Sequence, residues 1–215
     1  MEDNYRHKGM RKKLVNEIQK KGILNEQILD AINSIPRHLF MDSSFLEFAY
    51  EDKPFPIGSG QTISQPYTVA FQTQLLNVKP GVKILEIGTG SGYQACVLAE
   101  MGVEVYSIER QKKLFEKTRK FLSKFSYDLH LFCRDGYLGL PEHAPFDGIL
   151  ITAAAPEIPQ TLINQLKTGG VLVIPLGDAN VQTMFRMVKK KDGSLLKQAF
   201  GEFRFVPLLK NTSND

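Results

Sequence analysis

Three glycines at alternating positions form a loop that could hold an anionic ligand. Residues 85–95 read LEIGTGSGYQA, in which a short apolar run leads into Gly88, Gly90 and Gly92 and a helical pattern follows. Glycine lets a backbone approach a ligand closely, and the first N–H groups of a helix point at negative charge. A tight strand–helix turn without a ligand is the alternative, but its three glycines would cost conformational entropy for no gain. The spacing therefore predicts a ligand-binding turn.

The glycine spacing differs from the dinucleotide-binding fingerprint G-x-G-x-x-G/A. Gly88 and Gly90 fit it, but Tyr93 stands where a third small residue would allow close packing of helix on strand. The pattern E-x-G-x-G-x-G resembles instead the first motif of class I S-adenosylmethionine-dependent methyltransferases. The resemblance implies S-adenosyl-L-methionine as the cofactor, with S-adenosyl-L-homocysteine as the product. The implied loop residues are Glu86, Gly88, Thr89, Gly90, Ser91 and Gly92.

Two acidic residues follow the next two apolar runs. Glu109 ends the run 103–109, where a carboxylate can accept hydrogen bonds from both ribose hydroxyls of an adenosine. Asp135 and Gly136 follow the run 128–133, and the methyltransferase pattern implies that this aspartate approaches the adenine amino group. An exposed glutamate at a strand end and a plain Asp-Gly turn are the simpler interpretations of these residues.

The elements that would position these residues alternate between buried strands and amphipathic helices. Strands are predicted at 82–88, 103–109, 128–133, 146–152 and 171–177. Helices are predicted at 91–102, 110–125 and 158–170, the last one closed by two glycines. Two further strands follow, QTMFRMVKK and LLKQAFGEFRFVPL, joined by the turn KKDGS. The pattern predicts an α/β fold with a doubly wound, mostly parallel, Rossmann-like sheet and an antiparallel C-terminal strand pair.

The first 77 residues are predicted to form a helical cap and a substrate loop, in one domain with a cofactor-binding core at 78–215. Helices are predicted at 5–21 and 25–36, with Asn25 as the N-cap of the second, and a weaker helix at 41–50. Another helix is expected from Pro66 to about Asn77. Between them, residues 56–67 (PIGSGQTISQPY) are too rich in Gly and Pro for a helix or a central strand.

Composition limits the partners. No apolar run approaches the roughly 20 residues of a membrane span, and the charged start MEDNYRHKGMRKK lacks the apolar region of a signal peptide. Two cysteines are too few for a disulfide framework, so we expect a cytoplasmic protein. The net charge is +4, with basic residues clustered at 6–21 and 112–124. These clusters are either a nucleic-acid surface or solvated helix faces, and the lack of interleaved aromatics favours the latter. We expect a monomer without nucleic-acid or membrane partners.

The loop at 56–67 carries a more specific resemblance. PIGSGQTISQP, followed by a helix and LEIGTGSGYQ, closely resembles protein-L-isoaspartate (D-aspartate) O-methyltransferases. Further matching motifs are, in chain order, IPRHLF (35–40), FDGILITAAAPEIP (146–159), GGVLVIPLG (169–177) and RFVPL (204–208). The resemblance covers nearly the whole chain. It implies a protein-repair enzyme that methylates the α-carboxylate of L-isoaspartyl residues in damaged peptides and proteins, after which the ester closes unaided to a succinimide.

The chemistry of that reaction suits a chain without an obvious catalytic base. A carboxylate with a pKa of roughly 3.5–4 is already ionised at neutral pH, so direct in-line displacement needs alignment and exclusion of water. The sequence has no Ser/His/Asp or Cys/His constellation, and its four histidines and two cysteines have no metal-ligand spacing. No metal is therefore expected.

A carboxylate in a dry site needs hydrogen-bond donors. Thr62, Ile63 and Ser64 supply hydroxyls and backbone N–H groups, and the resemblance implies that Ser64 is the active-site serine, which positions substrate. It also implies that Gln61 and Thr62 contact the cofactor and that peptide lies against Val206 and Pro207. Capping of the helix that begins at Pro66 is the alternative role of Ser64, and an ordinary edge strand is the alternative for 204–208.

Two other functions remain open at this point. A class I methyltransferase acting on small carboxylates or RNA would share the cofactor loop, although ITAAAPEIP (151–159) lacks the N/D-P-P-Y/F tetrapeptide usual in methyltransferases of nucleic-acid amino groups. A cofactor-binding relative without catalysis would serve as an interaction module. The presence of Thr62, Ser64, Glu109 and Asp135 argues against the second.

Overall fold

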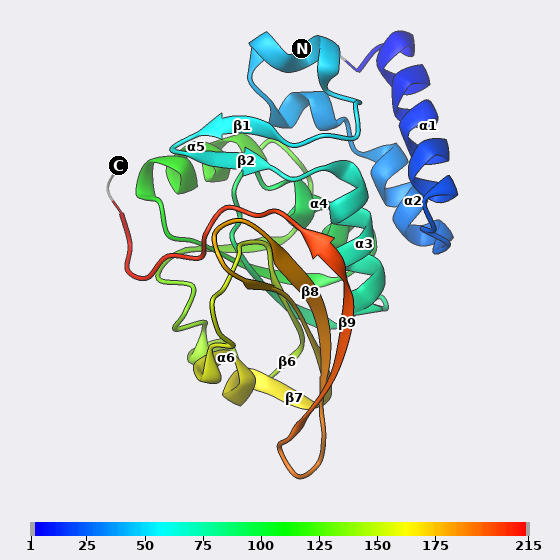
Figure 1. Cartoon of the computed structure of the whole chain (residues 1–215). Coiled ribbons are helices and arrows are strands. Elements are labelled where there is room, and N and C mark those ends of the chain that lie inside the picture. Colours follow the sequence, from blue (N-terminus) through cyan, green and yellow to red (C-terminus); the bar gives the residue numbers. More distant parts are fainter. Residues whose placement is uncertain (1–2, 214–215) are drawn as a thin grey trace.

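The computed structural model describes residues 3–213 and contains a seven-stranded sheet with helices on both faces (Figure 1). The strands of this sheet are β3 (Lys83–Ile87), β4 (Glu104–Glu109), β5 (Leu129–Cys133), β6 (Phe146–Ile151), β7 (Leu166–Gly177), β8 (Gln182–Lys189) and β9 (Leu195–Phe203). Their order is β5-β4-β3-β6-β7-β8-β9. The pairs from β5 to β7 are parallel, and β8 and β9 add in antiparallel fashion. The predicted fold class is confirmed.

Both faces of the sheet are buried. Ile84 of β3 lies in one hydrophobic cluster and its neighbour Leu85 lies in the other, on the opposite face. Successive side chains of a strand point to opposite faces, so a strand that is buried on both reads as a continuous apolar run. This is why the apolar runs of the sequence located the parallel strands closely.

The helices are α1 (Tyr5–Lys20), α2 (Glu26–Ser34), α3 (Pro66–Leu76), α4 (Tyr93–Glu100), α5 (Lys112–Leu122) and α6 (Gln160–Gln165), and the 3-10 helices are η1 (Arg37–Phe40), η2 (Ser43–Phe48) and η3 (Pro141–His143). Asn25 caps α2 as predicted, since its side chain accepts hydrogen bonds from two backbone N–H groups. Figure 1 shows α1 and α2 beside α3, and one hydrophobic cluster joins all three to the sheet. Within residues 3–213 no helix has the length and apolar character needed to cross a bilayer.

The predicted helix at 158–170 is wrong in its second half. Helix α6 ends at Gln165, and β7 begins at Leu166, five residues before the predicted strand. Leu166 already pairs with Phe146 of β6. The Lys189 ammonium group donates hydrogen bonds to the carbonyls of Ile163 and Leu166, at 2.8 Å each, and so satisfies the end of a very short helix.

The loop at 56–67 contains a β-hairpin that its Gly and Pro content concealed. Strands β1 (Phe55–Gly58) and β2 (Gln61–Ile63) pair in antiparallel register. Ser59 and Gly60 connect them with φ of 51° and 65°, the positive angles of a two-residue type I′ turn. The predicted helix at 41–50 is likewise only the 3-10 helix η2.

The C-terminal strand is shorter than predicted. Strand β9 ends at Phe203, and the following residues leave the sheet edge and run over the carboxyl end of β6. There the N–H of Ala154 donates to the carbonyl of Val206 at 2.8 Å, and the N–H of Leu208 donates back to Ala154 at 2.7 Å. The segment RFVPL is therefore anchored beside the glycine loop and is not an extension of β9.

Candidate active site

The glycine loop lies between β3 and α4 and is fixed by its own backbone. The N–H groups of Gly88 and Thr89 donate to the carbonyl of Ile108 in β4, at 2.9 and 3.1 Å. Gly88, Gly90 and Gly92 all have positive φ, at 104°, 53° and 83°. L-residues rarely adopt such angles, so each glycine is required by the backbone path.

Two of these glycines also have no room for a side chain. A Cβ on Gly88 would overlap the Oγ1 atom of Thr152, and a Cβ on Gly92 would lie 2.6 Å from a methyl group of Leu122. The Thr152 hydroxyl in turn donates to the carbonyls of Ile87 and Gly88, at 2.9 Å each. The loop is thus packed tightly against Thr152 and Leu122, and its remaining side faces the clefts described next.

Three hollows form one continuous path over the carboxyl ends of the strands. The outer cavity, about 860 Å³, lies between α3, β9 and the residues after β9. The central cleft lies over the glycine loop and shares Thr62, Ser64, Thr152 and Val206 with the outer cavity. The inner cleft, lined by apolar residues such as Ile108 and Leu208, shares Gln61, Gly88, Glu109 and Ala153 with the central cleft.

The structure brings most of the predicted site residues to these clefts. The central cleft is lined by Gln61, Thr62, Ile63, Ser64, Gly88, Thr89, Gly90, Ser91, Glu109 and Val206. The inner cleft is lined by Gly136 and Pro207, together with Gln61, Gly88 and Glu109. Three predicted residues line neither cleft, namely Glu86, Gly92 and Asp135.

Glu109 is held from two sides at the junction of the central and inner clefts. One carboxylate oxygen accepts a hydrogen bond from the N–H of Gly90 and the other from the N–H of Gln111, both at 2.9 Å. The residue is only 4% exposed. A carboxylate has about four lone-pair sites, so these two bonds leave acceptor capacity for a ligand.

Both carboxylate oxygens of Asp135 accept hydrogen bonds from backbone N–H groups. The donors are the N–H groups of Tyr137, at 2.9 Å, and Asn211, at 2.7 Å. The adjacent Gly136 is the residue that reaches the inner cleft, where a Cβ would overlap Ile87. Asp135 therefore fixes the turn and the C-terminal segment, and its contact with an adenine amino group stays a prediction.

Glu86 lies beneath the glycine loop, fully buried. The Ser107 hydroxyl hydrogen-bonds to the Glu86 carboxyl group and to the hydroxyl of Thr89, the latter at 2.6 Å. Burial raises the pKa of Glu86 to about 8, with a smaller contribution from the nearby charge of Glu109. Glu86 is thus a neutral acid at pH 7 that supports the loop from below.

This raised pKa predicts a pH-dependent loss of stability. The unfolded chain releases the Glu86 proton near pH 4.5, whereas the folded chain keeps it up to about pH 8. Stability is therefore lost as the pH rises between these values, by at most about 1.4 kcal/mol per pH unit. Urea unfolding should show that the free energy of unfolding of the wild type falls relative to that of Glu86→Gln from pH 5 to 8. Above about pH 8 the difference between the two proteins should level off. A difference independent of pH would contradict the buried neutral acid.

Thr62 and Ser64 present two hydroxyls to the boundary between the outer cavity and the central cleft. They lie two residues apart at the end of β2, so their side chains share one face, while Ile63 points into the core. Neither hydroxyl has a hydrogen-bond partner among residues 3–213. Both are available to an incoming ligand.

Two residues that sequence reasoning missed hold this hairpin in place. Asp52, whose side chain is 3% exposed, accepts hydrogen bonds from the N–H of Tyr67 at 2.7 Å and the side-chain amide of Gln65 at 3.0 Å. It thereby caps α3, whose own N-cap residue provides no side-chain bond. The buried Arg37 donates to the carbonyls of Ala49 and Lys53, just before β1. In the sequence, Arg37 is marked only by its place in the motif IPRHLF, which indicates no role for it.

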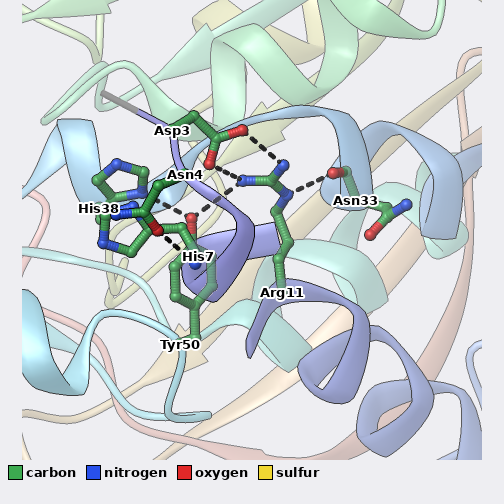
Figure 2. Close-up of polar contacts among 7 residues, drawn as sticks. All are labelled: Asp3, Asn4, His7, Arg11, Asn33, His38 and Tyr50. Atoms are coloured by element: carbon green, nitrogen blue, oxygen red, sulfur yellow. Dashed lines mark hydrogen bonds and ion pairs between the residues drawn. The ribbon is translucent and has the colours of Figure 1, made fainter. Parts of the chain in front are cut away.

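A separate polar cluster anchors the start of α1 (Figure 2). Arg11 donates to both carboxylate oxygens of Asp3, at 2.9 and 3.0 Å, and to the Tyr50 hydroxyl at 3.1 Å. His38 hydrogen-bonds to the same hydroxyl and stacks on His7 at 3.9 Å between ring centroids. Burial and the nearby His7 lower the pKa of His38 to about 4.

The donor atoms of Asp3, His7 and His38 lie within 4.8 Å of one another, close enough to share a cation. However, the Arg11 guanidinium occupies both oxygens of Asp3, and a positive charge there opposes a second cation. We assign this cluster the structural role of joining α1 to η1.

The clefts match the chemistry of S-adenosylmethionine. The glycine backbone lines the central cleft and leaves it free of side chains at Gly88 and Gly90, and Glu109 at the cleft junction offers acceptors suited to ribose hydroxyls. The inner cleft beyond Glu109 is lined mainly by apolar side chains, which suits a flat adenine ring. The donor set and the order of the clefts therefore fit this group.

Comparison with known proteins points the same way. Residues 9–213 match the protein-L-isoaspartate(D-aspartate) O-methyltransferase family. A protein-L-isoaspartate O-methyltransferase of Christiangramia forsetii is 58% identical, over 98% of this chain and 99% of its own. One from Dictyoglomus thermophilum is 46% identical, over 95% of this chain and 92% of its own.

Solved structures extend the comparison to three dimensions. A structure named protein-L-isoaspartate O-methyltransferase superposes with a TM-score of 0.85 at 32% identity, over 94% of this chain and 66% of that longer chain. Another, from Plasmodium falciparum in complex with S-adenosyl-L-homocysteine, gives 0.82 at 27% identity, over 94% of this chain and 99% of its own. With its glycine loop, hairpin and anchored C-terminal segment, the chain belongs to the protein-L-isoaspartate (D-aspartate) O-methyltransferase family.

Proposed function

We propose that this chain transfers the methyl group of S-adenosyl-L-methionine to the α-carboxylate of L-isoaspartyl residues in damaged peptides and proteins. One observation carries the proposal: Thr62, Ser64 and Val206 line both the outer cavity and the central cleft. A peptide in the outer cavity therefore meets these residues where the path turns toward the glycine loop. The names of the relatives, which align over nearly the whole chain, agree with this activity.

The chain's residues would position the reactants and exclude water. The cofactor supplies an activated methyl group on a sulfonium, and the substrate carboxylate is already ionised at neutral pH. Glu109 and the glycine loop would fix the cofactor end of the path, and the hairpin would fix the carboxylate end. Alignment of this kind lowers the barrier by up to roughly 7–11 kcal/mol. Because the carboxylate is already ionised, direct in-line displacement needs no general base.

Thr62 and Ser64 would hold the carboxylate. A carboxylate that leaves water without donors is strongly destabilised, and these two hydroxyls have no competing partner among the described residues. The backbone of Ile63 lies between them. Val206 and Pro207 would flank the peptide, since the Val206 carbonyl is bound to Ala154 and its position at the shared lining is thereby fixed.

Ser64→Ala should lower kcat/KM for an isoaspartyl peptide by about 10- to 100-fold, because a hydrogen bond to a charged group contributes roughly 1.5–3 kcal/mol. The Kd for S-adenosyl-L-methionine should change little, since the glycine loop and Glu109 remain. Steady-state kinetics and calorimetry would measure the two quantities. An activity equal to that of the wild type would remove Ser64 from the carboxylate site.

We further infer that the chain works as a cytoplasmic monomer without nucleic-acid or membrane partners. Both cysteines are free, Cys96 buried and Cys133 partly so. The basic residues of α5 alternate with a buried apolar face, as on a solvated helix. Residues 1–77 would serve as the helical cap and substrate loop, and residues 78–215 as the cofactor-binding core.

The proposed function is tested by methyl transfer from labelled cofactor to matched substrates. The panel contains an isoaspartyl peptide, the same peptide with Asp, and an RNA, and base-labile label is counted. Transfer to the isoaspartyl peptide alone is expected. Transfer to RNA or equally to the Asp peptide would favour another class of methyltransferase, and tight cofactor binding without any turnover would indicate an interaction module.

A further inference from the structure

Five aromatic side chains form one wall of the outer cavity. The aromatic wall consists of Tyr67 and Phe71 on α3, Phe200 and Phe203 on β9, and Phe205 just after β9. Ring centroids are 5.6 Å apart for Tyr67 and Phe71, 5.5 Å for Phe71 and Phe203, and 6.4 Å for Phe203 and Phe205. The first two pairs are stacked, so the wall is a nearly continuous row of rings.

The wall packs against the core but is not fully covered by the protein itself. All five side chains are partly exposed, and the surface that they leave open faces a cavity of about 860 Å³. Aromatic surface in a concavity is a site where an apolar group gains both burial and ring contacts. The wall therefore has room for one more apolar side chain.

The wall continues directly from Thr62 and Ser64, which form the proposed carboxylate site. Ser64 precedes α3, and Tyr67, Thr68 and Phe71 follow on the helix face that lines the same cavity. Tyr67 and Phe71 are four residues apart, about 6 Å along the helix axis. An extended peptide advances roughly 3.3–3.6 Å per residue, so the wall spans about two residues beside the carboxylate site.

We propose that the aromatic wall binds an apolar or aromatic side chain located one to three residues from the isoaspartyl residue of the substrate. This inference rests on the proposed function and adds a sequence preference to it. The cavity rim carries Glu202 and Arg204, both exposed and of opposite charge, so the rim itself does not select a charged flank. The predicted preference is therefore for apolar over polar neighbours.

The test is a series of isoaspartyl peptides that carry Phe or Ser at each of the three positions on either side. For the wild type we expect at least one position at which Phe lowers KM about tenfold, with kcat changed less. At that position, the KM for the Ser peptide divided by the KM for the Phe peptide should fall to within about twofold in the Phe200→Ala and Phe203→Ala variants. Leu196→Ala, an exposed residue of the same strand outside the cavity, is the matched control and should keep the ratio.

The outcomes separate this inference from the function on which it rests. Methylation of every peptide with equal KM would overturn the aromatic subsite alone. A preference that survives in both Phe variants would also overturn it, because the rings would then not cause the preference. Absence of turnover on all isoaspartyl peptides, with cofactor bound, would overturn the proposed function and the inference with it.

Discussion

Gly88→Ala is expected to raise the Kd for S-adenosyl-L-methionine at least 100-fold. Gly88 has a φ of 104°, and the added Cβ would overlap the Thr152 hydroxyl that binds the carbonyls of Ile87 and Gly88. Forcing a side chain into such a conformation costs about 1–3 kcal/mol before the overlap is relieved. Relief requires the loop or Thr152 to move, and both line the central cleft. Calorimetric titration with the cofactor measures the effect.

Gly81→Ala is the matched control. Gly81 precedes the same strand, β3, with a φ of 79°, but an added Cβ would meet nothing within 4 Å. It should reduce thermal stability through backbone strain and leave cofactor affinity within a few-fold of the wild type. Equal loss of affinity in both variants would mean that strain in β3, and not the shape of the loop, governs cofactor binding.

Glu109→Gln is expected to weaken cofactor binding by about 100-fold. The substitution replaces one carboxylate oxygen with an NH₂ group, which would face the N–H of either Gly90 or Gln111. Each lost charge-assisted hydrogen bond is worth roughly 1.5–3 kcal/mol, and the ribose hydroxyls would lose an acceptor as well. Calorimetry together with circular dichroism separates lost affinity from lost folding.

The same substitution at Glu86 should behave differently. Glu86 is already neutral at pH 7 because burial raises its pKa to about 8, and it lines neither cleft. Glu86→Gln is therefore expected to keep the Kd for the cofactor within about fivefold. Comparable losses in the two variants would show that Glu86 binds the cofactor directly, as its place in the motif had implied.

The glycine loop and Glu109 could be predicted from the sequence because each lies at the carboxyl end of a strand buried on both faces. Such strands read as largely apolar runs, interrupted here by Glu86 and Ser107, so their carboxyl ends can be located closely. Ile84 and Leu85, on opposite faces of β3, show why the pattern was largely apolar. The family resemblance then placed Ser64 and Val206, and both line the central cleft.

Other features depend on contacts between distant residues, which local patterns do not contain. The end of α6 is set by Lys189 on β8, and the entry to α3 is capped by Asp52 from 15 positions away. The aromatic wall is likewise assembled from distant parts of the chain, since its stacked rings Phe71 and Phe203 lie 132 positions apart. The protonation of Glu86 follows from burial, which the motif itself does not reveal.

The location of the transferred methyl group distinguishes α-carboxylate methylation from every alternative reaction. Three peptides differ only at one position, which is isoaspartate, aspartate, or isoasparagine with its α-carboxylate blocked as an amide. Each is incubated with cofactor carrying a deuterated methyl group and examined by fragmentation mass spectrometry at acidic pH. We expect one labelled methyl ester on the α-carboxylate of the isoaspartyl peptide and none on the other two. Label on the isoasparagine peptide, or equal label on the aspartyl peptide, would contradict it.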